Sequence, residues 1–186
     1  MKNNKYTICV YGSAGDGAFN EYKPIVEELG CKLAKNGYSL VYGAGSTGLM
    51  GAAARGFTKG NGEIIGVAPR FMTEFEALYD KCTELIQTDD MAERKSIMEY
   101  KADCFLVVPG GIGTLDELFQ VLALKQLKRH DKPIIIFDYD GFYALLVDLI
   151  MNYIDKGFLN EAIIDMFVVC ESPEDVINYL AFEQSE

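Results

Sequence analysis

Short apolar runs alternate with longer amphipathic stretches along the chain. Apolar runs of four to six residues, bounded by glycine, proline or asparagine, predict strands, and apolar residues at helical spacing predict helices. The expected strands are Tyr6–Tyr11, Ser39–Tyr42, Glu63–Val67, Thr83–Gln87, Cys104–Val108, Pro133–Phe137 and Phe167–Cys170. The expected helices are Phe19–Asn36, Thr47–Lys59, Asp90–Lys101, Leu115–Lys128, Phe142–Ile154 and one that starts at Ser172.

This alternation predicts an α/β fold. Strands that are apolar throughout are typical of a parallel sheet covered on both faces by helices. No linker or low-complexity segment interrupts the pattern, so we expect residues 1–186 to form a single Rossmann-like nucleotide-binding domain. Residues 68–81 are less regular, and we expect a short helix over a loop there.

Three of the expected strands end in glycine-rich turns, at Gly12–Gly17, Gly43–Gly48 and Gly110–Gly113. Because the carboxyl ends of parallel strands meet at one edge of the sheet, these turns should face one ligand site. The Pro109-Gly110-Gly111-Ile112-Gly113-Thr114 turn comes between a buried strand and a helix start. Glycines permit close approach of the backbone, and free N–H groups at a helix start favour an anion. We therefore expect Gly110, Gly111, Ile112, Gly113 and Thr114 to bind a phosphate group.

Glu117 follows this turn within one helical turn, which suggests chemistry on a phosphorylated substrate. Thr114-x-x-Glu117 is also a capping-box pattern, in which Glu117 would only bond the backbone of Thr114. Arg94 precedes the strand that carries the turn, and an arginine can grip phosphate with two N–H groups. The alternative for Arg94 is a solvated helix face. We expect Arg94 and Glu117 to be catalytic.

Lys95, Met91, Ser13 and Gly45 are further candidates for contact with the substrate. Gly43-x-Gly45-x-x-Gly48 matches the dinucleotide fingerprint, but no acid stands near the end of the next strand to bind a ribose. A tight strand-to-helix turn explains this pattern equally well. We interpret it as one wall of a mononucleotide pocket.

Composition and charge narrow the classes of function. The formal net charge of −11 opposes binding to nucleic acid, since that affinity depends on neutralising phosphates. No metal-site spacing is visible, and no apolar run reaches the ~18 residues needed to span a membrane. The five cysteines form no CxxC pair, and Cys9, Cys104 and Cys170 lie in apolar runs, so we expect these three to be buried thiols in the reducing cytoplasm. The single histidine, His130, lies in a charged loop, and we expect it to be exposed.

The motifs resemble one known family. Pro109–Glu117 matches the PGGxGTxxE signature of the LOG ("Lonely Guy") phosphoribohydrolases, which are often labelled lysine decarboxylases. Val41–Gly51 is similar to the family's GGGxxGLMG segment, and Met91–Lys95 to its MxxRK segment. The resemblance covers roughly Thr7 to Phe158 and departs from the family at Ala44, where glycine is usual.

The resemblance implies hydrolysis of the N-glycosidic bond of adenine-type nucleoside 5′-monophosphates, which releases the free base and ribose 5-phosphate. It implies no metal or redox cofactor, and a homodimer whose partner chain and 68–81 segment complete the base pocket. Two alternatives stay open: a nucleotide sensor that binds without cleavage, and an enzyme that acts on other bases such as pyrimidines.

Overall fold

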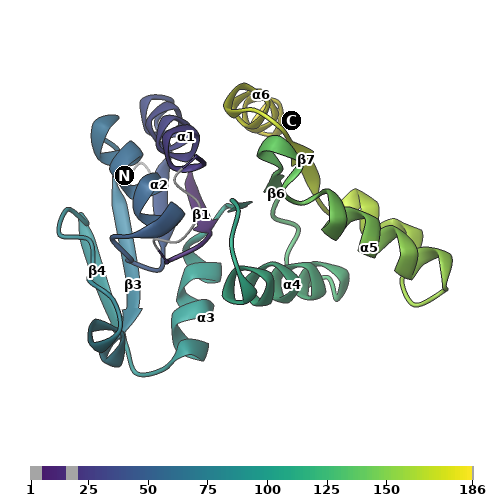
Figure 1. Ribbon diagram of the computed structural model, residues 1–186, viewed down its shortest axis with the longest axis horizontal. Helices are drawn as coiled ribbons and strands as arrows, with labels where there is room; N and C mark the ends of the chain where they lie inside the picture. Colours follow the sequence, from purple (N-terminus) through teal and green to yellow (C-terminus); the bar gives the residue numbers. More distant parts are fainter. Residues whose placement is uncertain (1–5, 16–20, 186) are drawn as a thin grey trace.

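The computed structural model describes residues 6–15 and 21–185, and these form a seven-stranded sheet with the order β4-β3-β2-β1-β5-β6-β7 (Figure 1). All strand pairs are parallel. The strands are β1 (Thr7–Tyr11), β2 (Ser39–Tyr42), β3 (Ile64–Pro69), β4 (Glu84–Thr88), β5 (Cys104–Val107), β6 (Ile134–Phe137) and β7 (Val168–Cys170). The predicted parallel sheet is confirmed.

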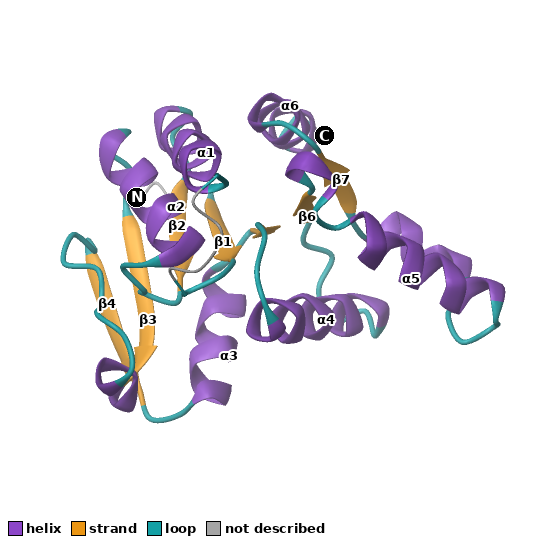
Figure 2. Cartoon of the chain, in the orientation of Figure 1, coloured by secondary structure: helices purple, strands orange, loops and turns teal. Residues whose placement is uncertain are grey.

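Helices cover both faces of this sheet (Figure 2). The layer on one face consists of α1 (Lys23–Lys35), α2 (Gly48–Lys59) and α6 (Pro173–Glu183). The layer on the other face consists of α3 (Met91–Lys101), α4 (Ile112–Gln126) and α5 (Ala144–Asp155). Short 3-10 helices occupy Arg70–Glu74, Tyr139–Gly141 and Glu161–Met166.

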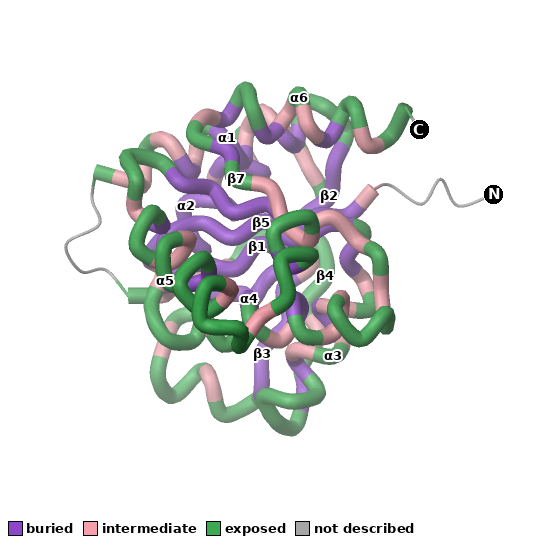
Figure 3. Tube along the Cα trace, turned by 90° about the vertical axis from the view of Figure 1, so that its right-hand side faces the viewer, coloured by how far each residue is buried: buried purple, intermediate pink, exposed green. Residues whose placement is uncertain are grey.

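The central strands β1, β2, β5 and β6 are buried between the two helical layers, whereas the edge strands β4 and β7 are partly exposed (Figure 3). Successive side chains of β1 point to opposite faces, so that Ile8 and Val10 pack under α1 and α2, whereas Cys9 and Tyr11 pack under α3 and α4. Burial on both sides explains why the central strands β5 and β6 are apolar at every position rather than at alternate ones.

Two local predictions are wrong. The helix α4 begins at Ile112 with Gly111 as its N-cap, three residues before the expected start, because the glycine turn itself enters the helix. His130 is only partly exposed, because its ring lies against Phe105 and its Nε2 contacts the Val121 carbonyl at 2.9 Å.

The helix expected from Phe19 begins at Lys23, and residues 16–20 lie outside the described part of the chain. Within the described residues, no helix is long and apolar enough to cross a bilayer, and no group of three or more His, Cys, Asp or Glu side chains is placed to hold a metal ion.

The strand order reverses at β1, which pairs with β2 on one side and with β5 on the other. The chain therefore leaves β1 and β5 toward opposite layers, and the two loops separate at the carboxyl edge of the sheet. In open α/β sheets this separation forms a crevice in which ligands bind. The first and third glycine turns lie at this point, because they follow β1 and β5.

Candidate active site

A cavity of about 380 Å³ lies at this crevice. Residues from both helical layers and from three connections between elements line it, namely Gly12, Ser13, Ala14, Gly15, Met50, Met72, Glu76, Met91, Arg94, Gly111, Gly113, Thr114, Asp116 and Glu117. We expected all three glycine turns to face this site: the first and third line the cavity, whereas no residue of the second, Gly43–Gly48, does, so its interpretation as a wall of the pocket is wrong. The volume falls within the range of pockets that bind small molecules.

The N-terminus of α4 opens into the cavity. Gly111 is the N-cap, and within the described chain no side chain caps this helix. The first N–H groups of a helix have no partner inside it, and they carry the positive end of the helix dipole. Gly111 and Gly113 are exposed, whereas Thr114 is buried at the floor of the turn. Open donors of this kind at a helix start can bind an anion.

The N-terminus of α2 is closed by protein atoms instead. The backbone N–H groups of Leu49 and Met50 both donate to the carbonyl of Ser13, at 2.9 and 3.1 Å. Gly48 makes this possible, since its φ is 61° and a Cβ there would overlap the Ser13 carbonyl. The second glycine turn therefore holds the first turn rather than a ligand phosphate, and of these two helix starts only that of α4 is open.

Arg94 and Glu117 form a buried ion pair in the cavity wall. Arg94 Nη1 donates to Glu117 Oε1 at 3.0 Å, and Arg94 Nε donates to the Val67 carbonyl at 3.2 Å. Arg94 is 4% exposed and Glu117 is 7% exposed. The alternative in which Glu117 only caps its helix is wrong, because Thr114 lies inside α4 and Glu117 pairs with Arg94.

The missing side chain of Gly43 makes room for this pair. A Cβ on Gly43 would overlap Arg94 Nη2, so another residue at this position would displace the guanidinium. The glycines of the apparent dinucleotide fingerprint are thus used for contacts within the protein. Ala44 stands where the LOG pattern has glycine, and its backbone adopts φ 65°, a conformation that is costly for residues with a Cβ.

Burial raises the pKa of the Glu117 carboxyl above its usual value, while the adjacent Arg94 charge opposes that shift. Removal from water disfavours the charged form, and a guanidinium at 3.0 Å favours it. Raised carboxyl pKa values at a cavity are typical of groups that take up and release protons. Glu117 is therefore a candidate for proton transfer in this cavity.

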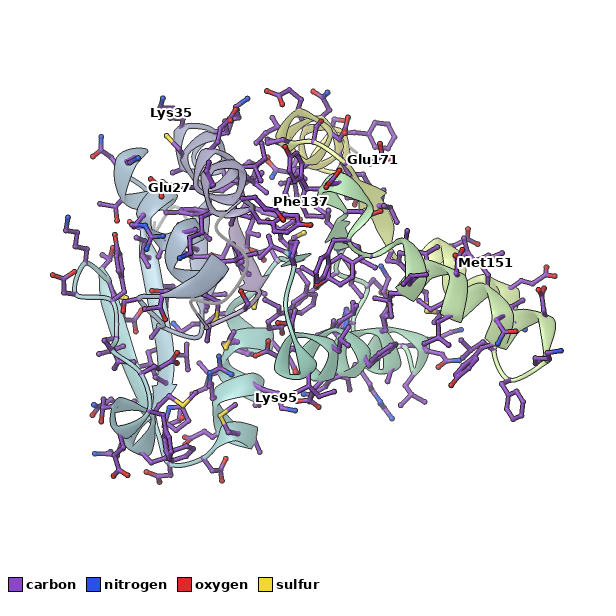
Figure 4. All side chains as sticks on the ribbon, in the orientation of Figure 1. Glu27, Lys35, Lys95, Phe137, Met151 and Glu171 are labelled. Carbon is purple, nitrogen blue, oxygen red and sulfur yellow. The ribbon has the colours of Figure 1, made fainter. Side chains whose placement is uncertain are left out.

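The remaining predicted residues have different surroundings. Lys95 lies between α3 and α4 (Figure 4), where its Nζ pairs with Asp116 Oδ2 at 2.9 Å, and Lys95 does not line the cavity. Met91 and Ser13 line it. Gly45 is buried beneath Met50 and Glu76, and Ile112 is 86% exposed outside it. Gly110 packs against the Thr114 side chain.

Sequence reasoning missed Met50, Met72 and Glu76, which also line the cavity. Met72 and Glu76 belong to the irregular 68–81 segment, which was expected to help form the base pocket. Nothing in the spacing of that segment distinguishes Glu76 from Glu74 or Asp80. The only indication in the sequence that this segment reaches the cavity is its position: it follows β3 and therefore starts at the same edge of the sheet.

Comparison with known proteins agrees with the family resemblance of the sequence motifs. A family model described as "Possible lysine decarboxylase" matches residues 50–180. The chain is 33% identical over 180 residues to the Arabidopsis thaliana cytokinin riboside 5′-monophosphate phosphoribohydrolase LOG5, covering 97% of this chain and 79% of that protein. It is 35% identical over 176 residues to the Mycobacterium tuberculosis cytokinin riboside 5′-monophosphate phosphoribohydrolase, covering 95% and 94%. The chain belongs to the LOG family.

Solved structures show the same fold in proteins with other names. The molybdenum cofactor binding protein of Rippkaea orientalis superposes with a TM-score of 0.72 at 23% identity, over 95% of this chain and 96% of that one. The molybdenum cofactor carrier protein of Chlamydomonas reinhardtii gives the same TM-score and identity, over 98% and 99%. At this identity the likeness concerns the fold, so the chemistry of this LOG chain has to be argued from its own cavity.

Proposed function

We propose that this protein hydrolyses the N-glycosidic bond of adenine-type nucleoside 5′-monophosphates, AMP or cytokinin riboside monophosphates, to the free base and ribose 5-phosphate. The observation that carries the proposal is the buried Arg94–Glu117 pair, which lies one helical turn from an open helix N-terminus in the same cavity. A phosphate binder needs no carboxylate beside the anion, whereas glycosyl transfer to water uses one. The names of the LOG relatives agree with this reaction class.

The 5′-phosphate binds to the backbone N–H groups at the start of α4, with the Thr114 hydroxyl beneath them. Thr114 is held there by its position in the first turn of the helix. The positive end of the helix dipole stabilises the phosphate charge, and the ribose then extends into the cavity toward Glu117. Binding at one fixed point positions C1′ for reaction.

Glu117 takes a proton from the attacking water as the water oxygen bonds to C1′. The C1′–N bond breaks and its electron pair leaves with the base. The developing positive charge on the ribose is stabilised by the carboxylate, as is usual for glycosidic bond cleavage. Arg94 orients Glu117 through its Nη1, while the Val67 carbonyl fixes the guanidinium from the other side.

The base occupies the part of the cavity that methionines surround. Met50, Met72 and Met91 line it together with Glu76. Methionine side chains adapt to irregular apolar shapes. A wall of this kind accommodates an adenine ring with or without an apolar substituent, which supports both AMP and cytokinin riboside monophosphates as substrates.

We also propose that the protein acts as a cytoplasmic homodimer. Apolar side chains of α5 stay exposed on the single chain, at 81% for Leu145, 44% for Leu149 and 47% for Tyr153, and the Tyr153 ring lies 6.3 Å from that of the exposed Phe158. We call these four residues the α5 stripe. Contiguous exposed apolar surface marks an interaction site. The five cysteines are free thiols, which agrees with a reducing compartment.

The deciding experiment is chromatography of AMP and isopentenyladenosine monophosphate after incubation with the purified protein. We expect free base and ribose 5-phosphate, and a fall in turnover of about 10²–10⁴-fold for Glu117→Gln, which preserves shape and removes the base. Glu28→Gln on the exposed side of α1 is the matched control and should keep full turnover.

Intact nucleotide with every substrate would contradict the proposal. A gain in melting temperature with AMP would then identify the sensor, and release of base from pyrimidine monophosphates alone would identify an enzyme for other bases. Equal turnover by Glu117→Gln and the wild-type protein would show that Glu117 is not the base.

A further inference from the structure

The proposed reaction uses one carboxylate, Glu117, but two others line the cavity. Asp116 is paired with Lys95, whereas Glu76 comes from a separate loop. Glu76 lies in the segment that follows the Arg70–Glu74 helix. This segment runs antiparallel to the second glycine turn: the N–H of Ser46 donates to the Ala77 carbonyl at 3.0 Å, and the N–H of Tyr79 donates to the Ala44 carbonyl at 2.9 Å. The N–H of Glu76 itself donates to the Met72 carbonyl at 3.0 Å, so backbone hydrogen bonds before and after Glu76 fix it over the turn.

Glu76 and Glu117 both lie near Arg94. A Cβ on Gly45 would lie 3.1 Å from Glu76 Oε2 and 3.2 Å from Met50 Cε, whereas a Cβ on Gly43 would overlap Arg94 Nη2. The carboxylate of Glu76 thus stands over Gly45, two residues along the turn from the guanidinium that binds Glu117. Both carboxylates line the one cavity.

The two carboxylates have unlike surroundings. Glu117 accepts a hydrogen bond from Arg94, which favours its charged form. Glu76 Oε1 is buried and has no hydrogen-bond partner within the described chain. An unpaired buried carboxylate oxygen is costly, and a proton on that oxygen removes the cost. Burial raises the pKa of Glu76, although the charge of Arg94 opposes the shift.

We propose that Glu76 is the general acid that protonates the departing base, on the condition that the proposed hydrolysis takes place. As the C1′–N bond breaks, its electron pair passes to the base, and the proton of the Glu76 carboxyl bonds to a purine ring nitrogen. The water proton passes to Glu117. The cycle leaves Glu76 charged and Glu117 neutral, and proton exchange with solvent restores both.

In active sites with two carboxylates, different surroundings commonly move the two pKa values apart, so that one group serves as the acid and the other as the base. The charged group that acts on Glu76 is Arg94 from α3. The neighbouring titratable groups are Tyr42 from β2, whose pKa the charge of Glu76 helps to raise, and Glu117 from α4, which is bound to Arg94. Of these, Arg94 carries the only positive charge, and it is already bound to Glu117.

The test compares two leaving groups in full-length protein. AMP needs a proton on its base, whereas 4-nitrophenyl riboside 5-phosphate releases an anion that needs none. We expect Glu76→Gln to lower kcat for AMP by about 10²-fold or more and to leave nitrophenolate release close to the wild-type rate. For AMP it should also remove the decline of kcat toward high pH, and Glu76→Asp should restore part of both. Glu74→Gln, on the exposed neighbouring glutamate, is the matched control.

An equal loss on both substrates with an unchanged pH profile would overturn the proposal, since it would show that Glu76 only shapes the pocket. Unchanged kcat for AMP would overturn it as well. If the wild-type protein does not accept the nitrophenyl substrate, the pH profile of AMP hydrolysis decides. No base release by the wild-type protein would refute the proposed function itself, and the acid role of Glu76 with it, whereas normal release by Glu76→Gln would refute the acid role alone.

Discussion

Arg94 and Glu117 come from two helices and meet only because β3 ends, and α3 and α4 begin, at the same edge of the sheet. Their charges are buried to 4% and 7% exposure. Desolvation of two charges offsets much of their mutual attraction, so such a pair adds little net stability. Its retention in a cavity wall is explained by chemistry better than by folding.

The pH dependence of hydrolysis follows from the direction of the Glu117 shift. Glu117 must be charged to accept a proton, and burial raises its pKa above the usual 4.5. We therefore expect kcat/KM to rise with pH along a limb that lies above that value, and to lose this limb in Glu117→Gln. The pH profile of kcat/KM for AMP measures the position of this limb. A limb at or below the usual pKa would contradict the assignment of Glu117 as the base.

Gly43→Ala tests the space that Arg94 occupies. The added Cβ would overlap Arg94 Nη2, so the guanidinium must move away from Glu117. We expect a loss of turnover close to that of Arg94→Ala, from kinetics with AMP. The double variant Gly43→Ala/Arg94→Ala should lose little more turnover than either single variant, because both substitutions disrupt the same Arg94–Glu117 contact. Additive losses would show that Gly43 serves a separate purpose.

At the scale of elements, two helices start at glycine turns beside the same cavity. They differ in whether a protein atom accepts hydrogen bonds from the backbone N–H groups at the N-terminus. Ser13 occupies the start of α2 through hydrogen bonds to Leu49 and Met50. The start of α4 has no such partner within the described residues. The sequence pattern cannot separate the two cases, because which N-terminus is filled depends on a loop that comes from another strand.

Gly113→Ala separates stability from phosphate binding. In the first turn of α4, a Cβ on Gly113 meets nothing within 4 Å, so alanine should stabilise the helix by about 0.5–1 kcal/mol. Gly113 also lines the cavity, and its new methyl group would take space from a phosphate. We expect a higher urea midpoint together with weaker AMP binding by calorimetry.

Adenosine, which lacks the phosphate, is the control ligand for this variant, and its affinity should not fall. Equal affinity of Gly113→Ala and the wild-type protein for AMP would place the phosphate away from α4.

At the scale of the whole molecule, α5 stands at one end, with Met151 on its outer side (Figure 4). Ile150 is the buried residue of this helix, while Leu145, Leu149 and Tyr153 stay exposed. A helix of this apolar character is stable at a surface only when something covers it. That residues 1–186 form one domain stays a prediction.

The α5 stripe makes the oligomeric state testable. We expect the wild-type protein to sediment as a dimer and Leu145→Asp to shift it toward the monomer, because a charge would be buried at the interface. The matched control is Phe182→Asp on α6, where the aromatic ring is 59% exposed and lies outside the stripe. A wild-type monomer, or an unaffected Leu145→Asp dimer, would contradict the stripe as the interface.

The sequence by itself determined the parallel α/β architecture, the glycine turns, and Arg94 and Glu117 as candidates, because buried strands and glycine-rich helix starts leave strong local patterns. Only the tertiary structure decided that Arg94 binds Glu117, that Ser13 closes α2, that Lys95 pairs with Asp116, and that Glu76 enters the cavity. These contacts join segments far apart in the chain. Their geometry depends on the order of the strands and on the absence of a Cβ atom at the glycines.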